Sequence, residues 1–232
     1  MLEHAASVKK LLKNPIIVLF VSLSLLLVCQ LYGALAAELV ASSLDDATRL
    51  VITSFVALIV LIALLGAVRK ALGVHLATFG LKKPSRRWIL ATVGGGVVYI
   101  VIASALIVVV TLLVKSFQAD QAQNVGLDSL VGTSQYVYSF IALALLTPVF
   151  EEIIFRGILF KGLRNRLPVW VAIGISSGMF ALAHGQWNVA LDTFVFGIVL
   201  SSLVEYSESI WPAILLHVAK NSFAFTLLFV LS

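Results

Sequence analysis

The sequence contains a single cysteine, Cys29, and few charged residues. A lone cysteine excludes an internal disulfide and any CxxC metal site. Charged residues make up 12% of the chain and hydrophobic residues 61%, whereas a soluble domain is about a quarter charged and about half apolar. The scarcity of charge excludes an ordinary soluble protein and indicates an integral membrane protein.

The formal net charge of +5 does not indicate a nucleic-acid partner. The basic residues lie between apolar runs and do not form a continuous stripe. Basic residues in such positions set the topology of a membrane protein and contact anionic lipid. We therefore expect a lipid bilayer as a partner and no nucleic acid.

Apolar runs long enough to cross a membrane core of about 30 Å recur along the chain. They cover residues 15–37, 50–68, 89–114, 137–160, 168–185, 189–204 and 209–231. No repeat of fixed period is visible. We expect an all-α, polytopic membrane protein, a bundle of about seven transmembrane helices, with six and eight as the alternatives.

The first apolar run has some features of a secretory signal peptide. Lys9, Lys10 and Lys13 precede it, and it ends in the small-residue sequence ALAAE. A signal peptide has an apolar region of about 7–15 residues, and the run from Pro15 to about Ala37 is longer. We interpret it as a retained first span.

Loop charges predict the orientation of the bundle. The basic segments are the N-terminus, with Lys9, Lys10 and Lys13, and the loops 69–88 and 161–167. The loops 38–49 and 115–136 each hold one basic residue beside acidic ones. Because cytoplasmic loops carry an excess of Lys and Arg, we expect the N-terminus and both basic loops in the cytoplasm. The expected location is a bacterial plasma membrane.

The fourth apolar run, PVFEEIIFRGILF, contains Glu151, Glu152 and Arg156. A charged side chain at the bilayer centre costs about 2.5–3.5 kcal/mol, so such residues indicate a functional site. Glu152 and Arg156 are four residues apart and can pair along one helix face. Glu151 is turned about 100° away from Glu152 and is free to face a cavity.

Two further apolar runs contain the stretches FALAH, ending at His184, and HVAKN, from His217 to Asn221. A carboxylate can accept a proton from water, imidazoles can hold a metal or stabilise an oxyanion, and an Asn amide can donate to the same oxyanion. Each group alone also fits a structural role, as a helix–helix hydrogen bond or a buried ion pair. Three spans that each supply polar groups favour a shared site.

The three stretches together resemble the CAAX-protease and bacteriocin-processing (CPBP, or Abi) family of intramembrane proteases. EEIIFRG matches its EExxxR motif, FALAH its FxxxH motif and HVAKN its HxxxN motif. The resemblance covers about residues 137–225. It divides the chain into residues 1–136, N-terminal helices and loops that are not diagnostic, and residues 137–232, a CPBP-like catalytic membrane core, within one integrated membrane domain.

The resemblance implies a role for each motif residue. Glu151 would be the general base that activates water, with His184 as its partner. His217 and Asn221 would form the oxyanion site, and Glu152 and Arg156 would shape the pocket. Relatives act on prenylated CAAX C-termini or are linked to bacteriocin maturation and self-immunity, so we expect a membrane-associated or lipidated peptide substrate.

The resemblance leaves two chemical mechanisms open. Zinc is a candidate cofactor, with Glu151, His184 and His217 as candidate ligands, and a metal-free glutamate mechanism is the alternative. The sequence contains no HExxH motif. Two other functional classes are a transporter or ion relay, for which several helices would be expected to carry polar residues, and a non-catalytic immunity or scaffold protein.

A shared site also requires a particular geometry. At 1.5 Å per residue, a straight fifth span would put His184 about 10 Å deeper than Glu151 and His217. We therefore expect that this span starts in the cytoplasm or tilts, with Gly174 and Gly178 allowing a close approach to neighbouring helices. The three side chains should then converge on a cavity that opens towards the cytoplasm.

Overall fold

The computed structural model describes residues 14–41, 43–119, 121, 127, 130 and 132–229, and within these ranges the chain is helical, without strands. Lys9, Lys10 and Lys13, on which part of the predicted orientation depends, lie outside them. The elements before the fourth span are α2 (Pro15–Ala41), α3 (Asp46–Leu72), the short 3₁₀ helix η1 (Leu76–Phe79) and α4 (Arg86–Leu113). Those after it are α8 (Val169–Leu182), α9 (Trp187–Ser207) and α10 (Trp211–Phe229).

The fourth span is one long helix, Thr133–Arg164, made of five consecutive segments. The segments are α5 (Thr133–Phe140), η2 (Ile141–Leu146), α6 (Thr147–Glu152), η3 (Ile153–Phe160) and α7 (Lys161–Arg164). Both η2 and η3 are π-helical. They flank α6, which ends with the two adjacent glutamates.

The expected all-α membrane bundle is confirmed, and a helix occupies most of the described part of each of the seven predicted apolar runs. Six helices among the described residues are long and apolar enough to cross a membrane: α2, α3, α4, Thr133–Arg164, α9 and α10. The seventh, α8, has 14 residues. At 1.5 Å per residue it is only about 21 Å long, too short to cross a core of about 30 Å.

The outer helices expose a surface that suits lipid and not water. Leu39 of α2 is 84% exposed, and Leu112 and Leu113 of α4 are each 77% exposed. Monomeric soluble proteins rarely present contiguous apolar surfaces of this kind. The protein is therefore an integral membrane protein.

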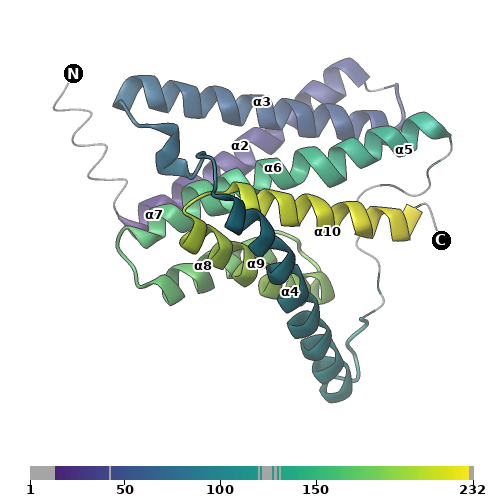
Figure 1. Ribbon diagram of the computed structural model, residues 1–232. Helices are drawn as coiled ribbons and strands as arrows, with labels where there is room; N and C mark the ends of the chain where they lie inside the picture. Colours follow the sequence, from purple (N-terminus) through teal and green to yellow (C-terminus); the bar gives the residue numbers. More distant parts are fainter. Residues whose placement is uncertain are drawn as a thin grey trace.

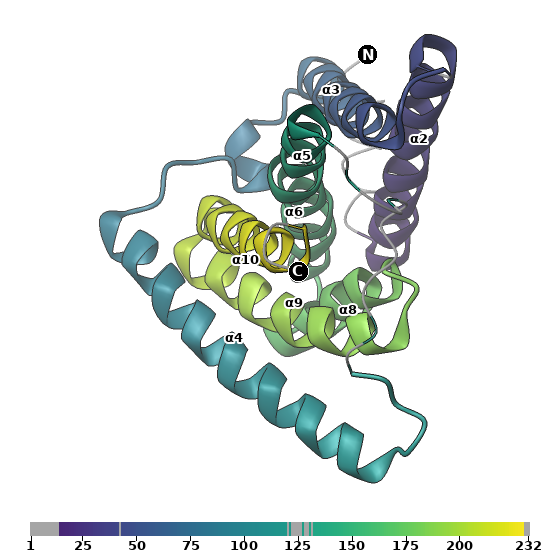
Figure 2. The same cartoon turned by 90° about the vertical axis from the view of Figure 1, so that its right-hand side faces the viewer.

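The helix Thr133–Arg164 lies in the middle of the bundle (Figures 1 and 2). On one side of it α2 and α3 pack against each other, and on the other side lie α10 and α9. The helix α4 packs on the outside of α9 and α10. The central helix therefore has protein on both sides along the part that carries the glutamates.

The helix α3 shows how local sequence fixes the ends of a span. Asp45 precedes it, and its carboxylate accepts a hydrogen bond of 3.0 Å from the Thr48 N–H, which caps the first turn. At the other end Gly73 adopts a left-handed conformation with φ of 61°, which glycine does at little cost. Arg69 and Lys70 lie in the last turn, where positive charge is favourable.

Candidate active site

The first glutamate-bearing turn follows a proline that changes the hydrogen-bond register of its helix. Pro148 has no N–H to give to a carbonyl of the preceding turn. The N–H of Thr147 bonds to Ala142 O, five residues back, as in a π-helix. In that register the next carbonyl, Leu143 O, would need the N–H of residue 148. Asn221 of α10 supplies the missing donor, since its Nδ2 lies 3.0 Å from Leu143 O.

This contact gives the motif asparagine a measurable structural role. Replacing Asn221 with Leu should destabilise the protein by about 1–3 kcal/mol, because the half-buried carbonyl of Leu143 loses its partner. In a Pro148→Ala background the same change should cost less, since residue 148 then has an N–H. Unfolding of the four proteins in detergent measures the coupling, and equal costs in both backgrounds would refute the role of Pro148.

The second glutamate forms a buried network with Arg156 and His217. Glu152 Oε1 accepts a 2.9 Å hydrogen bond from Arg156 Nη1 and lies 2.8 Å from His217 Nδ1. The side chains of Glu152 and Arg156 are 0% exposed. The predicted pair along the fourth span is therefore confirmed. Because the carboxylate accepts from Nδ1–H, it leaves His217 Nε2 free on the other side of the ring.

The first glutamate lies beyond that ring. Glu151 Oε2 is 3.7 Å from His217 Nε2, and its side chain is 18% exposed. The two carboxylates thus lie on opposite sides of one imidazole, and Glu151 is the one that water can reach. A separation of 3.7 Å is too long for a direct hydrogen bond.

Phe180 connects the two histidine motifs. Its ring is 4.8 Å from that of His184 and 5.7 Å from that of His217, both in edge-to-face contact. The Arg156 guanidinium lies over the same ring, 4.3 Å from its centroid, which stabilises a desolvated cation. The four-residue spacing of Phe180 and His184 thus brings the two rings into contact.

A side-chain hydrogen bond and a ring contact join α8 to η3 of the central helix. Ser176 of α8 donates a hydrogen bond of 2.9 Å to Phe155 O in η3. Phe180, one turn after Ser176, packs against the Phe155 ring with a centroid separation of 5.1 Å. His184 follows the end of α8, and its Nδ1 lies 2.8 Å from Phe180 O. With Nδ1 as donor, Nε2 of His184 remains available to a ligand.

The expected reason for the close packing of the fifth span was wrong. A Cβ atom added at Gly174 or Gly178 would meet no atom within 4 Å, so these glycines do not allow a close helix approach. Gly197 of α9 has this function, since a Cβ there would lie 2.9 Å from Ser177 Cβ. The helix α8 contacts α9 through Ser177, and the glycine that allows the close approach, Gly197, belongs to α9.

A second polar network, which the sequence analysis did not identify, borders the site. Lys220 Nζ is 2.8 Å from Asp192 Oδ2, and the Tyr99 hydroxyl donates to Asp192 Oδ1 at 2.7 Å. The Lys220 ammonium also lies 5.0 Å from the ring centroid of Phe196. That ring packs against His217. Asp192 is an ionisable residue within an apolar run. Since such residues indicate functional sites, the sequence could have identified it. No sequence feature of Tyr99 indicates its role.

Three buried polar atoms of the Glu152–Arg156 pair have no hydrogen-bond partner among the described residues: Glu152 Oε2, Arg156 Nε and Arg156 Nη2. Most buried polar groups in proteins are hydrogen-bonded, so these atoms require an explanation. They belong to the ion pair whose Glu152 Oε1 contacts the imidazole that faces Glu151. Their free hydrogen-bonding capacity fits a site that takes up water or a peptide group.

The residues do not form a preassembled metal site. No group of three His, Cys, Asp or Glu side chains in the described part of the chain is arranged to hold an ion. His217 uses Nδ1 for Glu152, which leaves it one ligating nitrogen. Glu151, His184 and His217 remain the candidate zinc ligands, and the proposed reaction is written without a metal.

Comparisons with known proteins agree with the motifs. Residues 133–223 match the family model described as "Type II CAAX prenyl endopeptidase Rce1-like". Over 80 residues the chain is 31% identical to "Putative membrane peptidase YdiL" of Bacillus subtilis (strain 168), covering 34% of this chain and 33% of that protein. The match thus spans about a third of the relative's length. No solved structure matches the chain.

The resemblance to the CPBP family of proteases is therefore confirmed for the part of the chain that contains all three motifs. The matched region runs from the start of α5 to within α10. It contains Glu151, Glu152, Arg156, His184, His217 and Asn221, but it does not test the role of any of them.

Proposed function

We propose that the protein is an intramembrane endopeptidase of the CAAX-protease type. The observation that supports this most strongly is the placement of Glu151, which is accessible and lies 3.7 Å from an imidazole held from behind by Glu152. A carboxylate and an imidazole at this separation can both hydrogen-bond one water that lies beside them. Both groups lie within helices buried in the bundle, where their geometry is fixed.

The proposed reaction begins at Glu151. Its carboxylate removes a proton from water, and the resulting hydroxide forms a bond to the carbonyl carbon of the peptide. The carbonyl oxygen becomes an oxyanion. When the C–N bond breaks, Glu151 returns the proton to the leaving amine, so that one water is consumed and the glutamate is regenerated.

His217 and Asn221 are the proposed oxyanion donors. His217 can donate through Nε2 only when both ring nitrogens carry protons, and the Glu152 carboxylate at Nδ1 would balance the charge of that form. Asn221 uses one N–H for Leu143 O and retains a second for the substrate. His184, with Nε2 available, is the proposed partner of Glu151 in orienting water.

The substrate is proposed to be a membrane-associated or lipidated peptide, of the CAAX or bacteriocin type, and the location a bacterial plasma membrane. Residues 1–136 and 137–232 are proposed to act as one membrane domain, which the Tyr99–Asp192 hydrogen bond between α4 and α9 supports.

Purified protein in liposomes should cleave a prenylated CAAX peptide faster than the same peptide without the lipid, as measured by mass spectrometry. Absence of cleavage for lipidated and bacteriocin-type peptides alike would refute the proposal.

Zinc dependence is a separate hypothesis with its own test. If zinc completes the site, chelation should abolish cleavage and added Zn²⁺ should restore it. If Glu151 activates water alone, activity should survive chelation. The comparison also decides whether the description metalloprotease applies.

The proposed orientation predicts the accessibility of four loop positions. Single cysteines at exposed Lys83 and Arg166 should react with a membrane-impermeant reagent only after the membrane is permeabilised. Single cysteines at Ser43 and Gln118 should react from outside in intact cells. Cys29 is 0% exposed, so the unmodified protein serves as an unreactive control. The reverse accessibility would overturn the orientation.

A further inference from the structure

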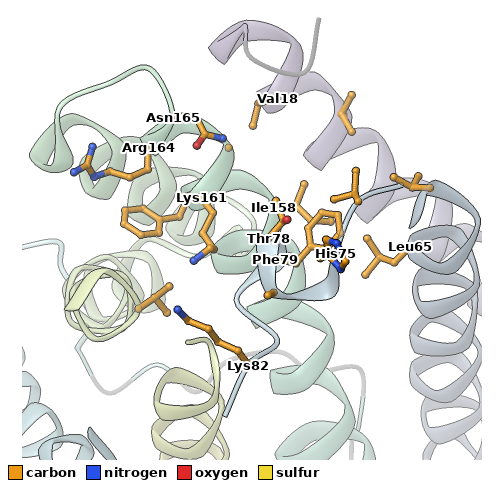
Figure 3. A pocket seen from close by; sticks show the side chains of 18 of the residues that line it. Val18, Leu65, His75, Thr78, Phe79, Lys82, Ile158, Lys161, Arg164 and Asn165 are labelled. Carbon is orange, nitrogen blue, oxygen red and sulfur yellow. The ribbon is translucent and has the colours of Figure 1, made fainter. Parts of the chain in front are cut away.

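A cavity of about 950 Å³, which neither Glu151 nor Glu152 lines, lies where the ends of several helices meet (Figure 3). Its lining comes from the first turns of α2, the last turns of α3, η1, the end of the central helix and the end of α9. None of the six candidate catalytic residues lines it. The cavity is therefore separate from the site described above.

The position of the cavity along the bundle follows from the helix ends. The helix α2 begins at Pro15, α3 ends at Leu72, the central helix ends at Arg164 and α9 ends at Ser207. Helices that cross a bilayer end near its boundary with water. The cavity therefore lies at one membrane boundary, on the side of the basic loops 69–88 and 161–167.

One wall of the cavity is apolar. It consists of Val18, Val21 and Leu25 of α2 and Leu65, Val68 and Leu72 of α3. Val18 and Leu25 are seven residues apart, so this wall extends about 10 Å along α2, from the boundary towards the membrane core. A wall of this kind fits hydrocarbon and offers no hydrogen bonds to a small polar ligand.

The other wall is charged, with an excess of positive groups. Lys82, Lys161 and Arg164 line it together with Glu205 and Glu208, so that three cations face two carboxylates. Arg164 Nε is 2.9 Å from Glu205 Oε1, and Lys82 is paired with Glu208. The hydrogen bond from Lys82 lowers the pKa of Glu208, which keeps that partner ionised.

Lys161 is the cation left over. Among the described residues it makes no ion pair or hydrogen bond, and the charged groups that act on it are Lys82, Glu208 and Glu205. In Figure 3 its ammonium group and that of Lys82 point towards the same space. Two ammonium groups that face one another repel, and an anion between them would remove the repulsion.

We propose that this cavity binds one anionic phospholipid, with its phosphate between Lys161 and Lys82 and an acyl chain along the wall formed by α2 and α3. A free phosphate would use only the cations, and a zwitterionic lipid would bring its own positive charge next to Lys161. An anionic lipid satisfies both walls at once. Basic pockets between helices on the cytoplasmic side are typical lipid head-group sites.

The test compares lipids on the purified protein by native mass spectrometry and by thermal unfolding in detergent. Phosphatidylglycerol should bind and raise the unfolding temperature more than phosphatidylcholine of the same chain length, because a ligand stabilises the state that it binds. Lys161→Gln should weaken phosphatidylglycerol binding about fivefold, the effect of one cation near a lipid head group. Lys70→Gln, at an exposed lysine at the end of α3 outside the cavity, is the matched control and should bind as the wild type does.

Two further arms separate the two walls. Val21→Trp should reduce phosphatidylglycerol binding with all charges intact, because the indole would occupy the space along the apolar wall where the acyl chain is proposed to lie. Inorganic phosphate should not reproduce the stabilisation by phosphatidylglycerol. Equal binding of both lipids, equal effects of Lys161→Gln and Lys70→Gln, or full stabilisation by phosphate would each overturn the proposal. If Lys161→Gln fails to fold, the lipid and phosphate comparisons on the wild type still decide.

Discussion

Glu151→Gln should abolish peptide hydrolysis and leave the protein inserted and folded. The amide keeps the shape of the side chain but cannot accept a proton from water. Loss of a general base lowers the rate typically by about 10²–10⁴-fold. The decrease should appear in kcat more than in KM, because the substrate still binds. Turnover of a lipidated peptide by purified protein in liposomes measures both.

The matched control for this variant is Glu205→Gln. Glu205 forms an ion pair with Arg164 at 2.9 Å, and both side chains are partly exposed. It lies outside the three motifs and in the lining of the separate cavity. The same chemical change there should leave hydrolysis unaffected. Wild-type turnover by Glu151→Gln would remove Glu151 from the mechanism.

Arg156→Ala should destabilise the protein by about 3–5 kcal/mol, since it leaves Glu152 buried without its cation. Both side chains are 0% exposed, and Arg156 also covers the Phe180 ring. Activity should fall as well, because the carboxylate that holds His217 loses its partner. Unfolding in detergent, followed by circular dichroism or intrinsic fluorescence, measures the loss.

Two comparisons make this prediction specific. Arg164→Ala breaks a pair whose side chains are 40% and 23% exposed, and it should cost about 0–1 kcal/mol. The double variant Glu152→Gln/Arg156→Met removes both charges and should recover much of the stability lost in Arg156→Ala, without recovering activity. Unchanged stability of Arg156→Ala would show that the buried pair contributes nothing.

The sequence predicted the helices because their signal is local. An apolar run of 20 residues has one low-energy form in a bilayer, a helix with all its backbone hydrogen bonds satisfied. The pairing of Glu152 with Arg156 and the packing of Phe180 against His184 were predictable for the same reason. In each case the partners are four residues apart on one helix, and both contacts are present.

Contacts between helices were harder to predict, because they depend on register. The Glu152–His217 and Asn221–Leu143 contacts join segments that lie 65 and 78 residues apart. Gly174 and Gly178 looked suited to close packing, yet Gly197 has that position. Spacing along one helix identifies a face, but it does not identify the neighbour that the face meets.

The two π-helical segments have a consequence for related sequences. A π turn holds one residue more than an α turn of the same helix, so the central helix behaves as an α-helix with an extra residue at each of two places. Deleting one residue from Ile141–Leu146 would restore the α register, and because the π segment absorbs that residue, α5 and α6 would keep nearly the same relative rotation. The face that α5 presents to α3 would then stay the same, and Glu151 would remain opposite His217. Relatives can therefore differ by a single-residue gap within this helix and still keep the same phase at the glutamates.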